Sequence, residues 1–139
     1  MTTPTATLVR PHVEIVRNLY AAYARGDVDA AVADLAEDVD WAAEASSDSV
    51  PWYGRYRGKS QVPAFFTAIA ANVNVTEFDV VTVASNDTEV IAVVHWTYTV
   101  TATGKTASMY MQHWFRFVDG KIAFFRGSED SEQSARAFG

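Results

Sequence analysis

The first half of the chain carries apolar residues at helical spacing. From His12 onward they recur every three or four residues as far as Arg25-Gly26, which predicts a helix that ends at a left-handed glycine. Asp27 then stands where the N-cap of a second, antiparallel helix is expected. A third helix is predicted to begin at Ser60, with Pro63 in its first turn, where the missing N–H costs little.

The segment between the second and third helices is less regular. The apolar positions of the second helix continue to Leu35, and Val39 and Trp41 then alternate with acidic residues, which predicts a short strand. Residues 46–58 read as a loop that carries three large aromatic side chains. Solvent-exposed loops seldom hold such residues without a surface to cover, so the Trp52-Tyr53 part is predicted to be a lid.

After residue 72 the hydrophobic period changes to two. Four long strands are predicted at 76–84, 89–101, 106–118 and 121–128, followed by a short helix at 131–138. Helices segregated from an antiparallel meander indicate an α+β domain. We expect three N-terminal helices packed on a strongly curved antiparallel sheet, which together form a cone open at one end. Residues 12–139 are predicted to be this single domain, and residues 1–11 a flexible tail.

The amino-acid composition limits which classes of partner and which kinds of chemistry are expected. The 139 residues are 49% hydrophobic and 13% aromatic, and the formal charge is −6, so a nucleic-acid partner is not expected. No apolar run approaches the roughly 20 residues needed to cross a bilayer, and no signal pattern opens the chain. There is no cysteine, which excludes disulfides and thiolate chemistry. We expect a cytoplasmic protein with no membrane partner.

A histidine stands within the apolar face of one predicted strand. His113 alternates in phase with Met111 and Phe115, so it is expected to meet a polar partner or a ligand inside the cone. A purely structural histidine is the alternative. His95 belongs either to the cavity face of its strand or to the outer face, with Trp96 on the opposite side. The other candidates for contact with a ligand are aromatic. Plain core packing is the alternative for the wall residues, whereas Trp52 and Tyr53 are the exception and belong to the predicted lid. The wall residues are Tyr20, Trp41, Phe65 and Phe66.

Asp130 follows the last predicted strand and has two interpretations. A carboxyl group inside an apolar cone has a raised pKa, which suits proton abstraction next to a carbonyl. The alternative is an N-cap of the last helix, with Gln133 three residues later to complete a capping box. Arg126 either pairs with Asp130 and depresses its pKa or lies on the outer face of the sheet, and we favour the outer face.

Several segments resemble the nuclear-transport-factor-2-like superfamily, and more narrowly its SnoaL-like and ketosteroid-isomerase-related members. The resemblance runs from about residue 12 to the C-terminus and implies the conical α+β fold. It also implies that Asp130 is an acid–base group of a cyclase, that His113 lies beside it, and that the protein is a homodimer through its sheet. The matching segments are 19–27, 35–39, 56–59, 113–122 and Asp130.

Differences between this sequence and those of enzymes in the superfamily argue against two of the known activities. The positions of the tyrosine and the aspartate base of a ketosteroid isomerase fall on Leu19 and Ala43, with Tyr20 and Glu44 each one residue away. The charged pair of the epoxide hydrolases is missing from residues 95–98. No metal site and no cofactor are expected. The sequence therefore favours a cofactor-independent cyclase, isomerase or lyase acting on a small hydrophobic carbonyl compound, and a non-catalytic small-molecule-binding protein is the alternative.

Overall fold

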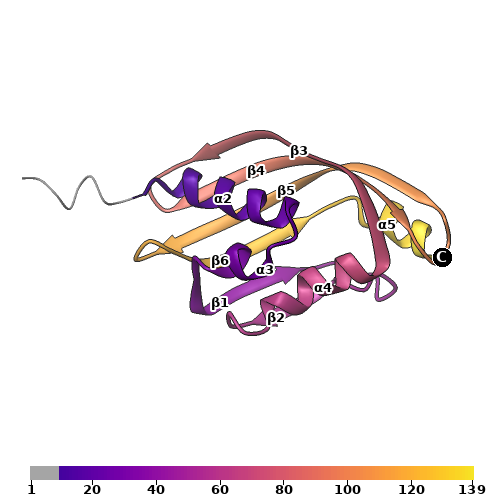
Figure 1. The fold of residues 1–139 in the computed structure, drawn as a ribbon, viewed down its shortest axis with the longest axis horizontal. Coiled ribbons are helices and arrows are strands. Elements are labelled where there is room, and N and C mark those ends of the chain that lie inside the picture. The colour runs from indigo at the N-terminus through magenta and orange to yellow at the C-terminus, as the bar shows by residue number, and fades with distance from the viewer. Residues whose placement is uncertain (1–9) are drawn as a thin grey trace, which may run out of the picture.

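The computed structural model describes residues 10–139, so the predicted N-terminal tail lies outside the described residues up to residue 9. The first described helix begins at His12, where the hydrophobic pattern predicts it. Six strands and four helices follow one another over residues 10–139 (Figure 1). In chain order they are α2 (His12–Ala24), α3 (Val28–Val32), β1 (Leu35–Ala43), β2 (Gly54–Arg57), α4 (Val62–Asn72), β3 (Val73–Ser85), β4 (Glu89–Val100), β5 (Thr106–Val118), β6 (Lys121–Ser128) and α5 (Ser131–Phe138).

The six strands form one curved sheet in the order β2-β1-β6-β5-β4-β3. Neighbouring strands are antiparallel except β1 and β6, which pair in parallel, so the sheet is mixed rather than wholly antiparallel. The pairing register shifts twice between β3 and β4 and once between β5 and β6. Such bulges bend a strand and increase its twist, which curves the sheet into the predicted cone.

The core lies between the sheet and the helices α2, α3 and α4, which cover one face of it (Figure 1). Strand β5 shows the two faces most clearly, because buried and exposed residues alternate along its whole length. The buried set is the one that the sequence pattern predicts, including Met111, His113 and Phe115. The predicted apolar face of α4 is also confirmed, with Phe65, Phe66 and Ile69 buried.

Local signals explain most of the element boundaries. Gly26 has φ 74°, the left-handed conformation that ends α2, and the Asp27 carboxylate accepts the Ala30 N–H at 3.1 Å to cap α3. Several boundaries differ from the prediction, since α4 begins at Val62 and not at Ser60, and β3 begins at Val73 and not at residue 76. Helix α3 stops at Val32, and Leu35 already belongs to β1. The predicted loop at 46–58 also contains the short edge strand β2. None of the helices within residues 10–139 is long and apolar enough to cross a membrane.

Candidate functional site

A pocket opens into the concave side of the sheet, between α2, α4 and the strands. Its cavity is about 50 Å³, enough for about three or four water molecules and smaller than the roughly 150 Å³ that holds a benzene ring. Its walls are almost entirely aromatic and aliphatic. The lining residues are Leu19, Tyr20, Tyr23, Trp41, Ala43, Trp52, Phe65, Phe66, Ile69, Phe78, Trp96, Met111, His113, Phe115, Phe125, Gly127, Ser128 and Glu129.

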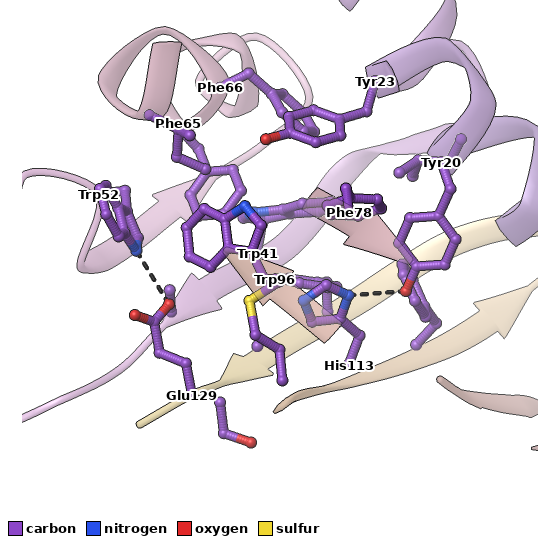
Figure 2. A pocket seen from close by; sticks show the side chains of 18 residues that line it. Tyr20, Tyr23, Trp41, Trp52, Phe65, Phe66, Phe78, Trp96, His113 and Glu129 are labelled. Carbon is purple, nitrogen blue, oxygen red and sulfur yellow. Dashed lines mark hydrogen bonds between the residues drawn. The ribbon is translucent and has the colours of Figure 1, made fainter. Parts of the chain in front are cut away.

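Tyr20 and His113 form a buried hydrogen-bonded pair at one side of this pocket (Figure 2). Tyr20 projects from the buried face of α2 and His113 from the buried face of β5, and the Tyr20 Oη lies 2.8 Å from His113 Nδ1. Burial lowers the pKa of His113 to about 4 and raises the pKa of Tyr20 above its ordinary range. Both groups are therefore neutral at pH 7.

The second nitrogen of His113 is directed into the pocket. Figure 2 shows Nε2 on the side of the ring turned away from Tyr20, and no side chain within residues 10–139 makes a hydrogen bond to it. A neutral imidazole carries one proton on one of its two nitrogens. When the Tyr20 hydroxyl donates to Nδ1, that proton is on Nε2. The pair then presents one N–H donor to whatever occupies the cavity.

The carboxyl group at the opposite side of the pocket belongs to Glu129, which directly follows β6. Trp52 Nε1 donates to its Oε1 at 3.1 Å, and the Tyr53 hydroxyl donates to its Oε2 at 2.9 Å. The Ser134 hydroxyl also donates to Oε2, and the Tyr98 hydroxyl donates to Ser134 Oγ at 2.7 Å. Burial raises the pKa of Glu129 above its ordinary value even though three donors favour the charged form.

Asp130, by contrast, does not line the pocket, which corrects the interpretation that its carboxyl group lies inside the cone. Its side chain is the N-cap of α5 and accepts the Gln133 backbone N–H at 3.1 Å. The Gln133 side-chain amide donates to the other oxygen at 3.2 Å. Asp130 is exposed to solvent. The capping interpretation is therefore the one that the structure supports.

Replacing Asp130 by alanine is expected to lower the free energy of unfolding by about 1 kcal/mol, the usual effect of losing an N-cap. Asp130→Asn should lose much less, because asparagine caps a helix almost as well as aspartate. Urea unfolding of the two variants and the unmodified protein measures both changes. Equal losses in the two variants would contradict a capping role.

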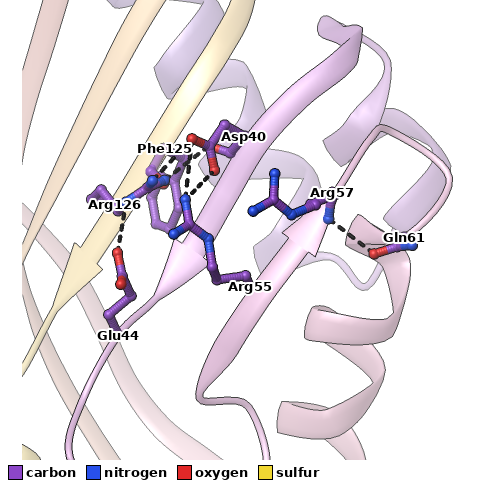
Figure 3. A network of polar contacts seen from close by, with 7 residues as sticks. All are labelled: Asp40, Glu44, Arg55, Arg57, Gln61, Phe125 and Arg126. Atoms are coloured by element: carbon purple, nitrogen blue, oxygen red, sulfur yellow. Dashed lines mark hydrogen bonds and ion pairs between the residues drawn. The ribbon is translucent and has the colours of Figure 1, made fainter.

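Arg126 lies on the outer face of the sheet, as expected, and it is fixed there by two carboxylates (Figure 3). Its guanidinium group lies 3.0 Å from Asp40 and 3.0 Å from Glu44, while Arg55 lies 3.4 Å from Asp40. The hydrogen bond from Arg126 is the main reason that the pKa of Asp40 falls below its ordinary value. Arg126 thus joins β6 to β1 and has no contact with Asp130.

The structure decides between the alternatives for His95 and differs from the expectation for Trp52 and Tyr53. His95 lies on the outer face with its Nδ1 2.8 Å from Glu77, so it does not reach the cavity. The cavity face of β4 carries Trp96 instead. Trp52 lines the cavity but is 1% exposed, so it belongs to the core and not to a lid. Tyr53 is half-buried and does not line the cavity, although its hydroxyl group holds Glu129.

The other predicted wall residues do meet at the pocket: Tyr20, Trp41, Phe65, Phe66, Met111 and Phe115, together with His113. The sequence did not lead us to Glu129, although it directly precedes Asp130, the residue that we favoured. The spacing of Asp130 and Gln133 was the available signal, because an aspartate committed to an N-cap leaves the preceding carboxyl group free to turn toward the sheet. No three or more His, Asp or Glu side chains within residues 10–139 are grouped in a way that would hold a metal ion.

Comparison with known proteins identifies the family. Residues 16–125 match the SnoaL-like domain, while no curated protein matches the chain. An NTF2-like protein from Burkholderia thailandensis has a similar structure, with a TM-score of 0.84 and 28% identity over 94% of this chain and 99% of that one. A candidate polyketide cyclase from Xanthomonas campestris pv. campestris has a TM-score of 0.69 and 24% identity over 91% and 96% of the two chains.

A third similar structure is that of TerC, co-crystallised with polyporic acid. It has a TM-score of 0.79 and 18% identity over 93% of this chain and 98% of that one. These likenesses agree with the curved six-stranded sheet and its covering helices, and they confirm the fold that the sequence segments suggested. The domain match covers well over half of the chain. The protein therefore belongs to the SnoaL-like family and has the NTF2-like fold.

Proposed function

We propose that the protein is a cofactor-independent acid–base enzyme, of the cyclase, isomerase or lyase type, acting on a small hydrophobic carbonyl compound such as a polyketide-like ring. One observation carries the proposal. An aromatic pocket holds a neutral histidine at one side and a carboxyl group at the other (Figure 2). Solved structures of the same fold that are described as a candidate isomerase and a candidate polyketide cyclase support the same reaction class, as does the SnoaL-like domain match.

His113 is the group that would face the substrate oxygen. Removal of a proton next to a carbonyl leaves negative charge on that oxygen, and a hydrogen-bond donor fixed in place stabilises it. Such a donor contributes about 3–4 kcal/mol at a developing oxyanion. Tyr20 would act through His113, because donation of its hydroxyl proton to Nδ1 would keep the ring proton on Nε2. Tyr20 is therefore a positioning residue.

Glu129 would remove the proton. Its raised pKa makes the carboxylate a stronger base than an exposed glutamate. In the common first step, the C–H bond next to the carbonyl breaks, the proton moves to Glu129, and the electron pair forms an enolate whose oxygen faces His113. Return of the proton to another carbon gives an isomerase, and attack of the enolate carbon on a second carbonyl gives a cyclase. Loss of a leaving group from the enolate gives a lyase.

Exchange of hydrogen for deuterium tests this step without knowledge of the natural substrate. We expect the protein to accelerate exchange at the carbon next to the carbonyl of 1-tetralone in D₂O, followed by proton NMR. Glu129→Gln should lower the protein-dependent rate by about 10²–10⁴, the usual contribution of a general base. Glu129→Asp should restore part of the rate, because it keeps a carboxyl group.

Asp130→Asn is the matched control, because it removes the neighbouring carboxylate, which lies outside the pocket. The Asp130→Asn variant should accelerate the exchange of hydrogen for deuterium in 1-tetralone as much as the unmodified protein does. Three donors already bind Glu129, an arrangement that also suits a pocket that only binds ligands. Binding of the ketone without any acceleration of exchange would reject the enzyme and leave the non-catalytic alternative.

The outer face of the sheet is the surface on which we expect a second copy of the chain. Tyr110 is 59% exposed, and Ile91 on the neighbouring strand is also exposed, although both are large and apolar. Light scattering should therefore give twice the 15.3 kDa mass of one chain. Tyr110→Glu should reduce the mass to that of one chain, whereas Ala71→Glu, at an exposed position of α4, should not. A single-chain mass for the unmodified protein would refute the homodimer.

A further inference from the structure

A groove opens on the surface of the protein directly beside the pocket. It lies between the end of α2, the end of α4 and the first half of β3, and its volume is about 360 Å³. Three side chains line both this groove and the cavity and are therefore the wall between the two, namely those of Tyr23, Ile69 and Phe78. The groove thus continues the pocket toward solvent.

A contact between two aromatic rings closes this wall. The ring centroids of Tyr23 and Phe78 lie 4.9 Å apart, and both residues are half-buried. On the cavity side, the ring of Phe78 lies 5.6 Å from that of Tyr20, whose hydroxyl group is bonded to His113. Figure 2 shows Tyr23 on the opposite side of the pocket from His113. A chain that passes between Tyr23 and Phe78 therefore reaches His113 along the ring of Tyr20.

The polar side chains of the groove are engaged elsewhere or uncharged. The Glu77 carboxylate lies 2.8 Å from His95 Nδ1 on the outer face of the sheet and accepts the Thr97 hydroxyl at 2.9 Å. The Thr76 hydroxyl donates to the backbone carbonyl oxygen of Thr97 at 3.4 Å. Burial raises the pKa of Tyr23 to about 12, so its hydroxyl group is neutral at pH 7. What remains for a ligand to contact is hydrocarbon, which suits an alkyl chain and not a charged group.

The cavity alone is too small for a substrate of more than a few atoms. Its volume of about 50 Å³ takes about three or four water-sized groups, which is the size of a carbonyl group with the carbon on either side. The groove, at about 360 Å³, is several times larger. A substrate with more carbon atoms than the cavity holds therefore extends into the groove, unless the cavity expands.

We propose that the groove is a substrate subsite for an apolar chain, which leaves the cavity between Tyr23 and Phe78 and lies against Ala70 and Val75. The substrate class is then a carbonyl compound that carries a flexible alkyl chain of several carbons. This inference rests on the proposed function, because it takes the His113 end of the cavity as the place of the reacting carbonyl. The rings of Tyr23 and Phe78 must move apart as the chain enters, since they are in contact in the closed structure.

Two methyl ketones that differ only in chain length test the subsite. 2-Pentanone and 2-nonanone have the same reacting end, but 2-nonanone has four more methylene groups. We expect 2-nonanone to bind at least tenfold more tightly, because each methylene group removed from water strengthens binding about three- to fourfold. Titrations followed by ¹⁵N NMR spectra give both affinities and the place of binding. 2-Nonanone, and not 2-pentanone, should shift the backbone N–H signals of Ala70 and Val75.

Filling the groove from its rim connects the preference to this surface. Ala70 is exposed on α4 and lines the groove, so Ala70→Trp places a large side chain where the alkyl chain would lie. The variant should reduce the affinity for 2-nonanone toward that for 2-pentanone and leave the affinity for 2-pentanone nearly unchanged. Ala64→Trp is the matched control, because Ala64 is also exposed on α4 but lines neither the groove nor the cavity. It should leave both affinities as they are. The comparison of the two ketones on the unmodified protein remains decisive if a variant fails to fold.

The outcomes separate this inference from the proposed function. Equal affinities for the two ketones, or groove signals that stay in place when 2-nonanone binds, overturn the chain subsite. Accelerated exchange of 1-tetralone would still support the proposed enzyme in that case. Tighter binding of 2-nonanone in the groove without accelerated exchange of any ketone would support the subsite and reject the enzyme. Failure of both methyl ketones and of 1-tetralone to bind overturns the two proposals together.

Discussion

Lowering the pH from 7 to 5 is expected to remove about 2 kcal/mol from the free energy of unfolding through His113 alone. Burial lowers the pKa of His113 to about 4, whereas its value in the unfolded chain is near 6.5. Between these values the unfolded chain binds a proton that the folded chain does not, so falling pH favours unfolding. The full loss, reached below about pH 4, is about 3 kcal/mol. Urea unfolding at intervals of half a pH unit measures it.

Protonation of Glu129 changes the free energy of unfolding in the opposite direction, so its effect must be measured separately from that of His113. Because its pKa is raised in the folded chain, its contribution to stability is lost as pH rises and recovers as pH falls. The pH dependence of Glu129→Gln should therefore be steeper than that of the unmodified protein. His113→Gln keeps a polar partner for Tyr20 but does not titrate, so its stability should hardly fall between pH 7 and 5. An unchanged slope in His113→Gln would contradict a buried neutral histidine.

The sequence predicts the sheet well where hydrophobic period and turn residues act together. The bounds of β5, β6 and α5 agree with the prediction, because turn residues or a capping signal mark the ends of these elements. The partner of β1 was not predictable in the same way. No short-range signal selects β6, which lies about 80 residues away, as its parallel neighbour. Pairing of that kind depends on how the whole sheet closes.

The candidate site shows the same limit at the level of single side chains. Alternation places His113 on a buried face, and the structure adds the Tyr20 hydroxyl 2.8 Å away, from a helix 93 residues earlier. For β4, alternation separates His95 from Trp96 but does not say which of the two faces the cone. The helices decide it, because they cover the face that carries Val94, Trp96 and Tyr98. Which of the two adjacent carboxyl groups, Glu129 or Asp130, faces the pocket depends likewise on which of them caps α5.

Trp52 shows why an aromatic residue in an irregular segment misleads. The segment has no periodicity, so nothing in it reveals that the indole is inserted between the sheet and the last helix. In the structure the ring of Trp52 lies 5.5 Å from that of Trp96, 5.6 Å from that of Tyr98 and 5.5 Å from that of Phe138. Its N–H holds Glu129 at 3.1 Å. Trp52 thereby fixes the segment of residues 46–53 to the sheet and to α5.

Trp52→Ala is therefore expected to lower the free energy of unfolding by about 3–5 kcal/mol, the usual loss when a large buried aromatic side chain is removed. Trp52→Phe separates packing from hydrogen bonding, because it keeps a ring but cannot donate to Glu129. Its loss should be smaller, about 1.5–3 kcal/mol, the range for a hydrogen bond to a charged group. Urea unfolding of both variants at pH 7 gives the two values. A loss below about 1 kcal/mol for Trp52→Ala would mean that the indole is a lid after all, since a side chain that swings open in solution adds little to the stability of the core.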